Sequence, residues 1–245
     1  MVFIVAECGV NWDGDWEYAK EMISQAKKVG ADAVKFQTFL PEHVEGHPEA
    51  PRLLSSSLFY DTAKPLKAYA EDEVGIEFFV TPFYEKAIDW LETLGVNRYK
   101  IREKDARIMT EQPGYVPPLV EKALATGKEL FISVQRKPID NWLFWHPQIK
   151  WLYCLPLYPP RLEEIEFWHC RSMDGYSNHY PHIIAPLTAA ILGAKIIEVH
   201  VTLSHNMDVP DKAVSLDFAE LNQLVEYVRM VEKENLELSR ELPVF

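Results

Sequence analysis

The sequence predicts a parallel (β/α)₈ barrel, because short apolar runs alternate with amphipathic segments and polar residues gather at the ends of those runs. Eight runs rich in β-branched and aromatic residues have the length of strands. We expect these strands at residues 3–7, 32–39, 76–83, 99–102, 129–135, 149–155, 175–179 and 195–203. A chain of 245 residues fits one barrel of the usual size, so residues 1–245 are expected to form a single TIM-barrel domain.

Most segments between the expected strands have helical periodicity. In residues 16–29, for example, Ala19, Met22, Ile23 and Ala26 recur on one face. Further helices are expected near residues 60–73, 85–94, 118–126, 159–170, 183–192 and 217–234. Each expected strand is thus followed by a helix or by a gap of helical size, which is the order of elements in a barrel.

Three stretches lack this pattern, namely residues 41–57, 104–117 and 136–148. All three follow expected strands. In a barrel they would therefore lie on the face where the strands end, and long loops on that face are usually functional.

Charge and composition exclude several classes of function. The chain is 48% hydrophobic and 25% charged, with a formal net charge of −12, which argues against a nucleic-acid-binding or anionic membrane surface. A small basic pocket for an anionic substrate stays compatible with this charge. Cys8, Cys154 and Cys170 form no CxxC pair, so a reduced, cytoplasmic setting is expected. The first residues resemble a strand rather than a signal peptide, and residues 183–194 are too short to span a bilayer.

Polar side chains stand towards the C-terminal ends of the expected strands. Since side chains alternate along a strand, residues two apart share a face. The residues concerned are Glu7, Lys35, Gln37, Thr81, Lys100, Arg102, Ser133, Ser177, His179, Glu198 and His200. An unpaired buried lysine or glutamate costs several kcal/mol. A ligand explains charges collected at one rim better than packing does.

Each of these residues also has a purely structural interpretation. Lys35 and Lys100 could point outward and pair with neighbouring helices. His179 and His200 could be hydrogen-bonded core histidines. Two histidines on adjacent strands, with Glu198 two residues before one of them, equally fit a divalent-metal site with open positions. Spacing alone leaves both interpretations open.

At these positions the sequence resembles the sialic acid synthase family, which condenses phosphoenolpyruvate (PEP) with N-acetylmannosamine or a related sugar. The opening VAECGVNWDGDWEYAKEMISQAKKVGADAVKFQTF is similar to the family's AEIGVNHNGD and AGADAVKFQT segments. VTPF, RYKI, YSNHY, ILGAKIIEVHVTL and VPDKAVSLDFAEL follow in the family's order. The resemblance covers almost the whole chain.

The resemblance implies a barrel that binds PEP through lysines. Lys35 and Lys100 would hold the PEP carboxylate and phosphate, with Thr81, Ser133 and Ser177 assisting. A PEP-dependent transferase of this kind forms a carbon–carbon bond and releases phosphate. The product would be a sialic-acid-like nonulosonate.

The resemblance also implies a metal and a sugar site. His179 and His200 would bind a divalent cation, with Mn²⁺ first and Mg²⁺ or Co²⁺ as alternatives. The residues that would face or support an amino-sugar acceptor are Glu7, Gln37, Tyr158, Glu198 and Asp211. Either Glu7 or Glu198 could handle protons, and the choice stays open.

The chain departs from the family pattern at the phosphate and sugar ends. Glu103 stands in place of a phosphate-contacting serine, and Pro156 in place of a phosphate-contacting asparagine. Arg102 or Arg136 could supply the missing contacts, because a guanidinium binds phosphate in a bidentate manner. The chain stops at Phe245, so the family's C-terminal antifreeze-like domain, which lends an arginine to the partner's sugar site, is expected to be absent.

Three functions remain in competition. The leading hypothesis is the metal-assisted, PEP-dependent condensation. The second is a lyase or aldolase that uses Lys35 or Lys100 as a Schiff base, and the third is a degenerate homologue that binds sugar or PEP without catalysis. We expect residues 41–57 and 104–117 to cover the barrel mouth, with a homodimer or a separate antifreeze-like polypeptide as further partners to consider.

Overall fold

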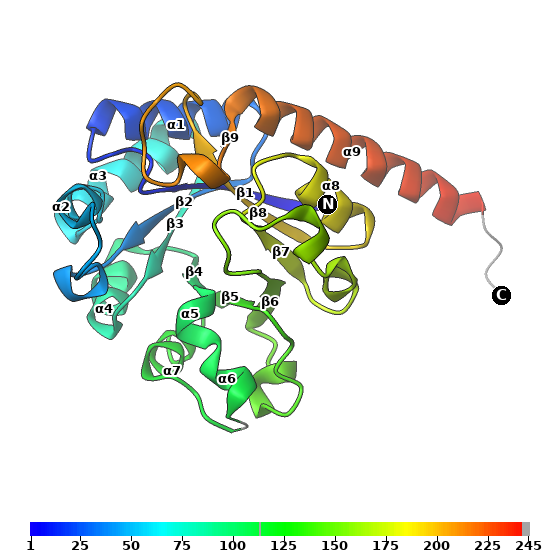
Figure 1. The fold of residues 1–245 in the computed structure, drawn as a ribbon, viewed down its shortest axis with the longest axis horizontal. Helices are drawn as coiled ribbons and strands as arrows, with labels where there is room; N and C mark the ends of the chain where they lie inside the picture. The colour runs from blue at the N-terminus through cyan, green and yellow to red at the C-terminus, as the bar shows by residue number, and fades with distance from the viewer. Residues whose placement is uncertain (113, 242–245) are drawn as a thin grey trace.

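The computed structural model describes residues 1–112 and 114–241, and the side chains of residues 1–112 and 114–234. Strands β1 to β8 pair in parallel in chain order, and β8 pairs with β1, which closes the predicted (β/α)₈ barrel (Figure 1). The strands are β1 Phe3–Gly9, β2 Ala33–Thr38, β3 Glu77–Pro82, β4 Arg98–Ile101, β5 Glu129–Val134, β6 Ile149–Tyr153, β7 Gly175–Asn178 and β8 Ile196–Thr202. A short β9, Leu216–Asp217, pairs with the end of β8.

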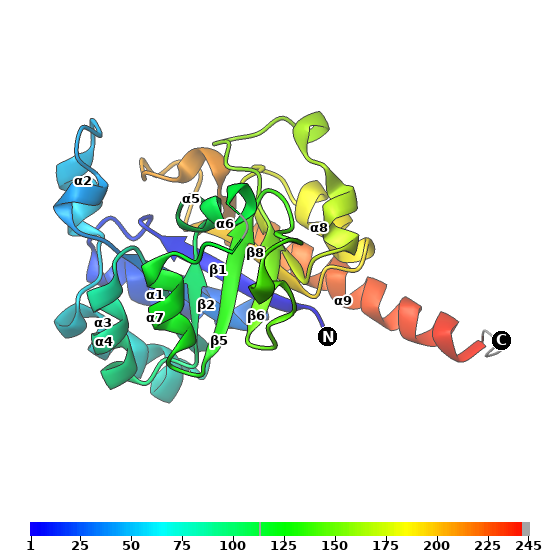
Figure 2. The ribbon, with the colours of Figure 1, turned by 90° about the horizontal axis from the view of Figure 1, so that it is seen from below.

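Helices surround the barrel, as the periodicity predicts. They are α1 Trp16–Lys28, α2 Ala50–Ser55, α3 Tyr60–Ala68, α4 Glu85–Leu94, α5 Glu103–Ala106, α6 Ile108–Glu111, α7 Pro118–Leu124, α8 Ile184–Ile191 and α9 Phe218–Glu241. α3 continues as a π-helical turn, Tyr69–Val74. The two stretches expected as loops after β2 and β4 contain the short helices α2, α5 and α6. α9 runs along the barrel and projects beyond it (Figures 1 and 2).

The helix predicted at residues 159–170 is wrong. The structure has two 3₁₀ turns there, Leu162–Glu164 and Phe167–Arg171. The Glu166 amide donates to the Tyr153 hydroxyl at 2.9 Å, and the His169 ring stacks on the Tyr153 ring. These contacts with β6 override the helical pattern. As expected, residues 136–148 form no α-helix and contain the 3₁₀ turn Trp142–Trp145.

The barrel interior has an apolar lower half and a polar upper half. The lower half is a buried cluster of one inward-facing residue from most strands: Val5, Ala33, Phe79, Phe131, Leu152 and Ile196. Two residues further along the same strands stand Glu7, Lys35, Thr81, Ser133 and Glu198, as period-two alternation requires. The register places Glu7 beside both Lys35 and His200, and Ser177 beside Glu198. The polar layer is thereby built from different strands.

The N-terminal end of the barrel is closed by Arg98. Its guanidinium lies 4.5 Å from the centroid of the Phe3 ring and 4.9 Å from that of Phe131. Glu77 and Glu129 neutralise it through ion pairs. Among the described residues, no helix combines the length and the apolarity needed to cross a bilayer.

Candidate active site

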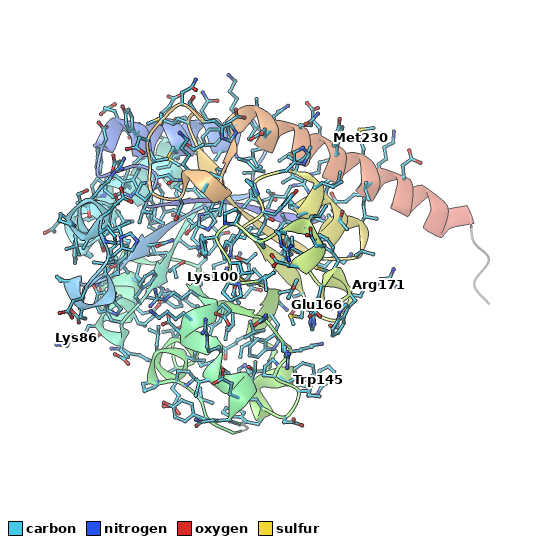
Figure 3. All side chains as sticks on the ribbon, viewed as in Figure 1. Lys86, Lys100, Trp145, Glu166, Arg171 and Met230 are labelled. Atoms are coloured by element: carbon cyan, nitrogen blue, oxygen red, sulfur yellow. The ribbon has the colours of Figure 1, made fainter. Side chains whose placement is uncertain are left out.

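One cavity of about 480 Å³ opens at the C-terminal ends of the strands, a volume typical of small-molecule sites. Figure 3 labels Lys100, which lies near the centre of the ring of strands. The cavity is lined by the expected site residues Glu7, Lys35, Gln37, Thr81, Lys100, Arg102, Ser133, Tyr158, Ser177, His179, Glu198, His200 and Asp211. Arg136, the alternative phosphate contact, is exposed and does not line it. The inward interpretation of Lys35 and Lys100 is therefore confirmed, while the roles of all these residues stay predictions.

Further cavity residues were not assigned from the sequence. The loop after β2 contributes His43, and the segment after β4 contributes Glu103, Lys104 and Arg107. His43 is half-buried, with its Nε2 2.9 Å from the Phe83 carbonyl oxygen. All four are polar residues that follow the C-terminal end of a strand. The criterion that selected polar residues at strand ends could therefore have been extended to them.

Two lysines and two glutamates form a buried charge network at the cavity floor. Lys35 Nζ donates to Thr81 Oγ1 at 2.7 Å and lies 3.0 Å from Glu7 Oε2 and 3.6 Å from Glu198 Oε1. Lys100 Nζ donates to the same Glu198 oxygen at 2.6 Å. Two cations and two anions leave this network formally neutral. Without the carboxylates the lysines could not stay charged at this depth.

The environment perturbs the pKa values of this network in different directions. Burial alone would raise the pKa of Glu198, but Lys100 and Lys35 outweigh it and lower the pKa to about 2. Burial opposes the charge of Lys35 as well, yet Glu198 and Glu7 raise its pKa overall. For Lys100 burial dominates, and its pKa is lowered. Lys100 is therefore the better candidate for an amine nucleophile.

His179 is held with a defined tautomer. Its Nδ1 lies 3.0 Å from the Leu155 carbonyl oxygen, which can only accept, so Nδ1 carries the proton and Nε2 the lone pair. Tyr158 Oη lies 2.8 Å from that Nε2. Burial, followed by the neighbouring His200, lowers the pKa of His179 to about 3. The ring is neutral at pH 7, as a metal ligand must be.

His200 faces a carboxylate. Its Nδ1 lies 3.2 Å from Asp211 Oδ2. Burial would lower the pKa of His200, but Asp211 outweighs it and raises the pKa. Asn11 holds Asp211 in place, because its Oδ1 accepts from the Asp211 amide at 2.8 Å. The ring centroids of His200 and His179 are 5.4 Å apart. A carboxylate behind a histidine is the arrangement that orients metal-binding imidazoles, so this pair fits a divalent cation.

Two buried polar atoms at the cavity, Ser133 Oγ and Glu198 Oε2, have no hydrogen-bond partner within the described part of the chain. Glu7 Oε2 and His200 Nδ1 have only their ion-pair contacts with Lys35 and Asp211. Burying such atoms without a partner costs about 1–3 kcal/mol each. Their gathering at one cavity indicates that the cavity binds a polar ligand.

Arg102 does not form the open third cation that the sequence suggested. Its guanidinium is bound by Asp105, with Nη2 3.1 Å from Oδ1 and Nε against Oδ2. It also lies 3.5 Å from the centroid of the Phe83 ring. Arg102 thus lines the cavity with its fork already occupied.

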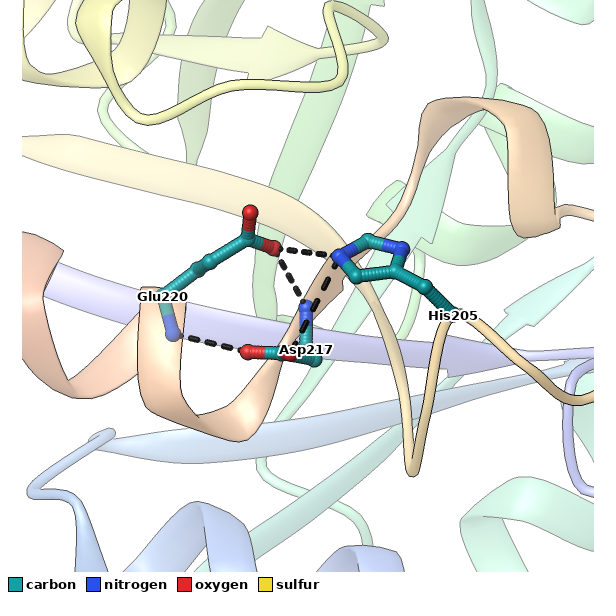
Figure 4. A group of neighbouring side chains, drawn as sticks. All are labelled: His205, Asp217 and Glu220. Carbon is teal, nitrogen blue, oxygen red and sulfur yellow. Dashed lines mark hydrogen bonds and ion pairs between the residues drawn. The ribbon is translucent and has the colours of Figure 1, made fainter.

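A second group of metal-ligand types lies outside the cavity. His205 Nε2 is 2.7 Å from Glu220 Oε2 and 3.9 Å from Asp217 Oδ2 (Figure 4). Asp217 Oδ1 accepts from the amides of Ala219 and Glu220, and Glu220 accepts from the Asp217 amide. This is the hydrogen bonding of a helix N-terminus, which explains the group without an ion.

Comparison with known proteins decides the family. The family model described as the NeuB family matches residues 22–237. The chain belongs to the NeuB family. This NeuB chain is 35% identical to an uncharacterised protein of Methanocaldococcus jannaschii, over 94% of its own length and 71% of that protein. It is 31% identical to the N,N'-diacetyllegionaminic acid synthase of Legionella pneumophila, over 94% and 72%.

A solved structure also aligns with the NeuB chain. The crystal structure of the N-acetylneuraminic acid synthetase of Leptospira borgpetersenii, in complex with citrate, has a TM-score of 0.83 and 25% identity. The alignment covers 98% of this chain and 92% of that one. The expected resemblance to sialic acid synthases is therefore confirmed at the level of the family.

Proposed function

We propose that this NeuB chain condenses PEP with an N-acetylmannosamine-like sugar, giving a sialic-acid-like nonulosonate and phosphate. The carrying observation is the cavity floor, where buried lysines, carboxylates and unpartnered polar atoms face one space. The names of the Legionella and Leptospira relatives support the substrate class. In the reaction, C3 of PEP bonds to the sugar aldehyde carbon, whose oxygen takes a proton. Water adds at C2, and the C2–O bond to phosphate breaks.

The chain's own residues would position the anionic substrate. Lys35 and Lys100 lie on neighbouring sides of Glu198, so their ammonium groups can bind a carboxylate and a phosphate from below. Hydroxyls of Thr81 and Ser133 line the same space and can donate, while the Ser177 hydroxyl lines it and donates to Glu198. Fixed charges of this kind stabilise charge that develops in the transition state.

Proton transfer has two candidate carboxylates. Glu7 Oε1 accepts from Gln37 at 2.7 Å, and Glu198 Oε1 accepts from Lys100 and Ser177. The second oxygen of Glu7 lies 3.0 Å from Lys35 Nζ, whereas that of Glu198 has no hydrogen-bond partner within the described residues. The kcat values of Glu7→Gln and Glu198→Gln distinguish the two carboxylates. Only substitution of the proton-transferring residue should reduce kcat while PEP still binds.

The two histidines are the proposed metal site. His179 and His200 would hold a divalent cation, Mn²⁺ in first place, through nitrogens not bound to Leu155 or Asp211. The bound cation would polarise the acceptor aldehyde as a Lewis acid. Tyr158 now bonds to His179 Nε2, so a cation there replaces that hydrogen bond.

Phosphate release tests the proposal. Purified protein is incubated with PEP, Mn²⁺ and a panel of N-acetylated hexosamines, with and without a chelator. We expect sugar-dependent and chelator-sensitive release of phosphate. PEP binding without turnover on any sugar would move the degenerate-homologue hypothesis ahead. Addition of a separate antifreeze-like polypeptide shows whether the segments after β2 and β4 suffice to cover the mouth.

A Schiff-base lyase is the second candidate, because burial lowers the pKa of Lys100. Such an enzyme forms a covalent imine with a carbonyl substrate. Borohydride added with pyruvate traps the imine as a stable mass increase on Lys100. We expect no adduct, since Glu198 at 2.6 Å favours the protonated amine.

A further inference from the structure

The end of β4 carries a buried carboxylate that the lysine network does not use. Glu103 lines the cavity and is only 6% exposed. A buried carboxylate needs a compensating charge. Arg107 supplies it one turn later, with its Nη2 2.6 Å from Glu103 Oε2. The Arg107 amide also donates to the Glu103 carbonyl oxygen at 2.8 Å, which fixes the spacing of the two residues across α5.

Arg107 is anchored at one side and open at the other. Its side chain is 48% exposed and lines the cavity. A guanidinium has five N–H donors, and the contact with Glu103 uses one of them. The remaining N–H groups can donate to a second anion. Arg102, five residues earlier in the same segment, differs because both oxygens of Asp105 accept from its guanidinium.

A second donor stands nearby. α5 packs against β5, whose end carries Ser133. Ser133 Oγ is buried, lines the same cavity and has no hydrogen-bond partner in the described part of the chain. An arginine fork and a hydroxyl on adjoining elements form a suitable pair of donors for a tetrahedral anion.

We propose that Arg107, anchored by Glu103, binds the phosphate group of the substrate, and this inference rests on the proposed use of PEP. Glu103 on its own would repel phosphate. Paired with Arg107, it instead holds the guanidinium between two anions. In the segment after β4, Glu103 replaces the serine that contacts phosphate in the family. Arg107 would supply a stronger contact than that serine, because both partners of a guanidinium–phosphate hydrogen bond are charged.

The test is calorimetric titration of the full chain, in the presence of Mn²⁺, with PEP, with inorganic phosphate and with pyruvate. For R107A we expect binding of PEP and phosphate to weaken by about 10- to 100-fold, the range of a lost charge-assisted contact. Pyruvate, which lacks the phosphate, should bind as it does to the wild type. R107K should recover part of the loss, because lysine supplies the charge without the fork.

Two controls separate phosphate binding from damage to the fold. R161A alters an arginine that pairs with Glu164 outside the cavity and should leave PEP affinity within about threefold of the wild type. E103Q/R107A removes the buried charge that R107A alone leaves without a partner, and it should still bind PEP weakly. Recovery of wild-type affinity in that double variant overturns the inference.

Other outcomes also decide it. Unchanged PEP affinity in R107A, or equal weakening for pyruvate and PEP, overturns the role of Arg107. A wild-type chain that binds PEP through Arg107 but turns over no sugar refutes the proposed function and leaves the phosphate contact standing.

Discussion

The lower and upper halves of the barrel interior are built from the same strands but solve opposite problems. Below, Phe79, Phe131 and their neighbours fill the space with apolar side chains. Two residues higher, Lys35 and Glu198 bury charge around a cavity. Close packing makes the lower half contribute to the free energy of unfolding, whereas the upper half holds buried polar atoms without hydrogen-bond partners in the described part of the chain. Stability and ligand binding should therefore respond to different substitutions.

The largest expected effect on stability is in the lower half. Phe131→Ala should lower the free energy of unfolding by about 3–5 kcal/mol, because it leaves a cavity in a packed layer. Denaturant unfolding measures this. Trp145→Ala is the control, since that side chain is 83% exposed and should change stability by no more than about 0.5 kcal/mol. Equal losses in both variants would contradict the division into halves.

In the upper half, Asp211→Asn should weaken Mn²⁺ binding by about 10- to 100-fold, because the carboxylate orients His200 from behind. The unfolding free energy should change little. Isothermal titration with Mn²⁺ gives the affinity. Glu220→Gln, in the exposed group with His205, is the matched control and should leave the affinity unchanged. An effect of Glu220→Gln as large as that of Asp211→Asn would shift the metal site out of the cavity.

Arg52 and Arg229 link helices to opposite ends of the barrel, so matched substitutions of the two residues compare those ends. Arg52 joins α2 to Asp13 and Asp208 above the cavity, and Arg229 joins α9 to Asp32 and to the Val2 carbonyl oxygen below. Their side chains are 26% and 28% exposed. Lysine lacks the fork, so each Arg→Lys variant should lose about 1 kcal/mol of stability.

Metal binding should distinguish the Arg52→Lys variant from the Arg229→Lys variant. Arg52→Lys should also increase hydrogen exchange in residues 208–211 and weaken Mn²⁺ binding a few-fold, because the same segment carries Asp211. Arg229→Lys should affect neither. Weakened Mn²⁺ binding in Arg229→Lys alone would mean that the lower end controls the site.

The smallest effect arises outside both halves. Burial lowers the pKa of His169, against the raising influence of Glu166. A histidine whose pKa is lowered by folding binds protons more readily when unfolded, so it reduces stability as pH falls below its unfolded pKa of about 6.5. His169→Phe should remove this pH-dependent loss of stability, and any change that it causes above that pH should not depend on pH. Unfolding curves at pH 5 and pH 8 measure the difference, which must be subtracted before acid effects are assigned to the site.

The sequence predicted the barrel and its polar rim because both depend on local rules. Alternation along a strand placed Lys35 and Gln37 on one face, and closure of the barrel brought that face to Glu7. The sequence could not show that Asp105 would bind the Arg102 guanidinium while that of Arg107 kept N–H groups free for a ligand. That difference depends on how α5 turns after β4. The missed 3₁₀ turns after β6 likewise depend on contacts with Tyr153.

The His179 partner shows the same limit. The sequence placed Tyr158 near the sugar, but its hydroxyl is bonded to His179 Nε2. A loop contact of this kind has no periodic signal. The side chain still lines the cavity, so its predicted role with the sugar stays open to test.

The central claim is that the upper half binds PEP beside a divalent cation. A crystal soaked with PEP and Mn²⁺, measured for anomalous scattering, tests it most directly. We predict a manganese peak about 2.0–2.3 Å from a ring nitrogen of each of His179 and His200, with phosphate density against Arg107 and Ser133. A peak only at His205, Asp217 and Glu220, or PEP density without manganese in the cavity, would contradict the account.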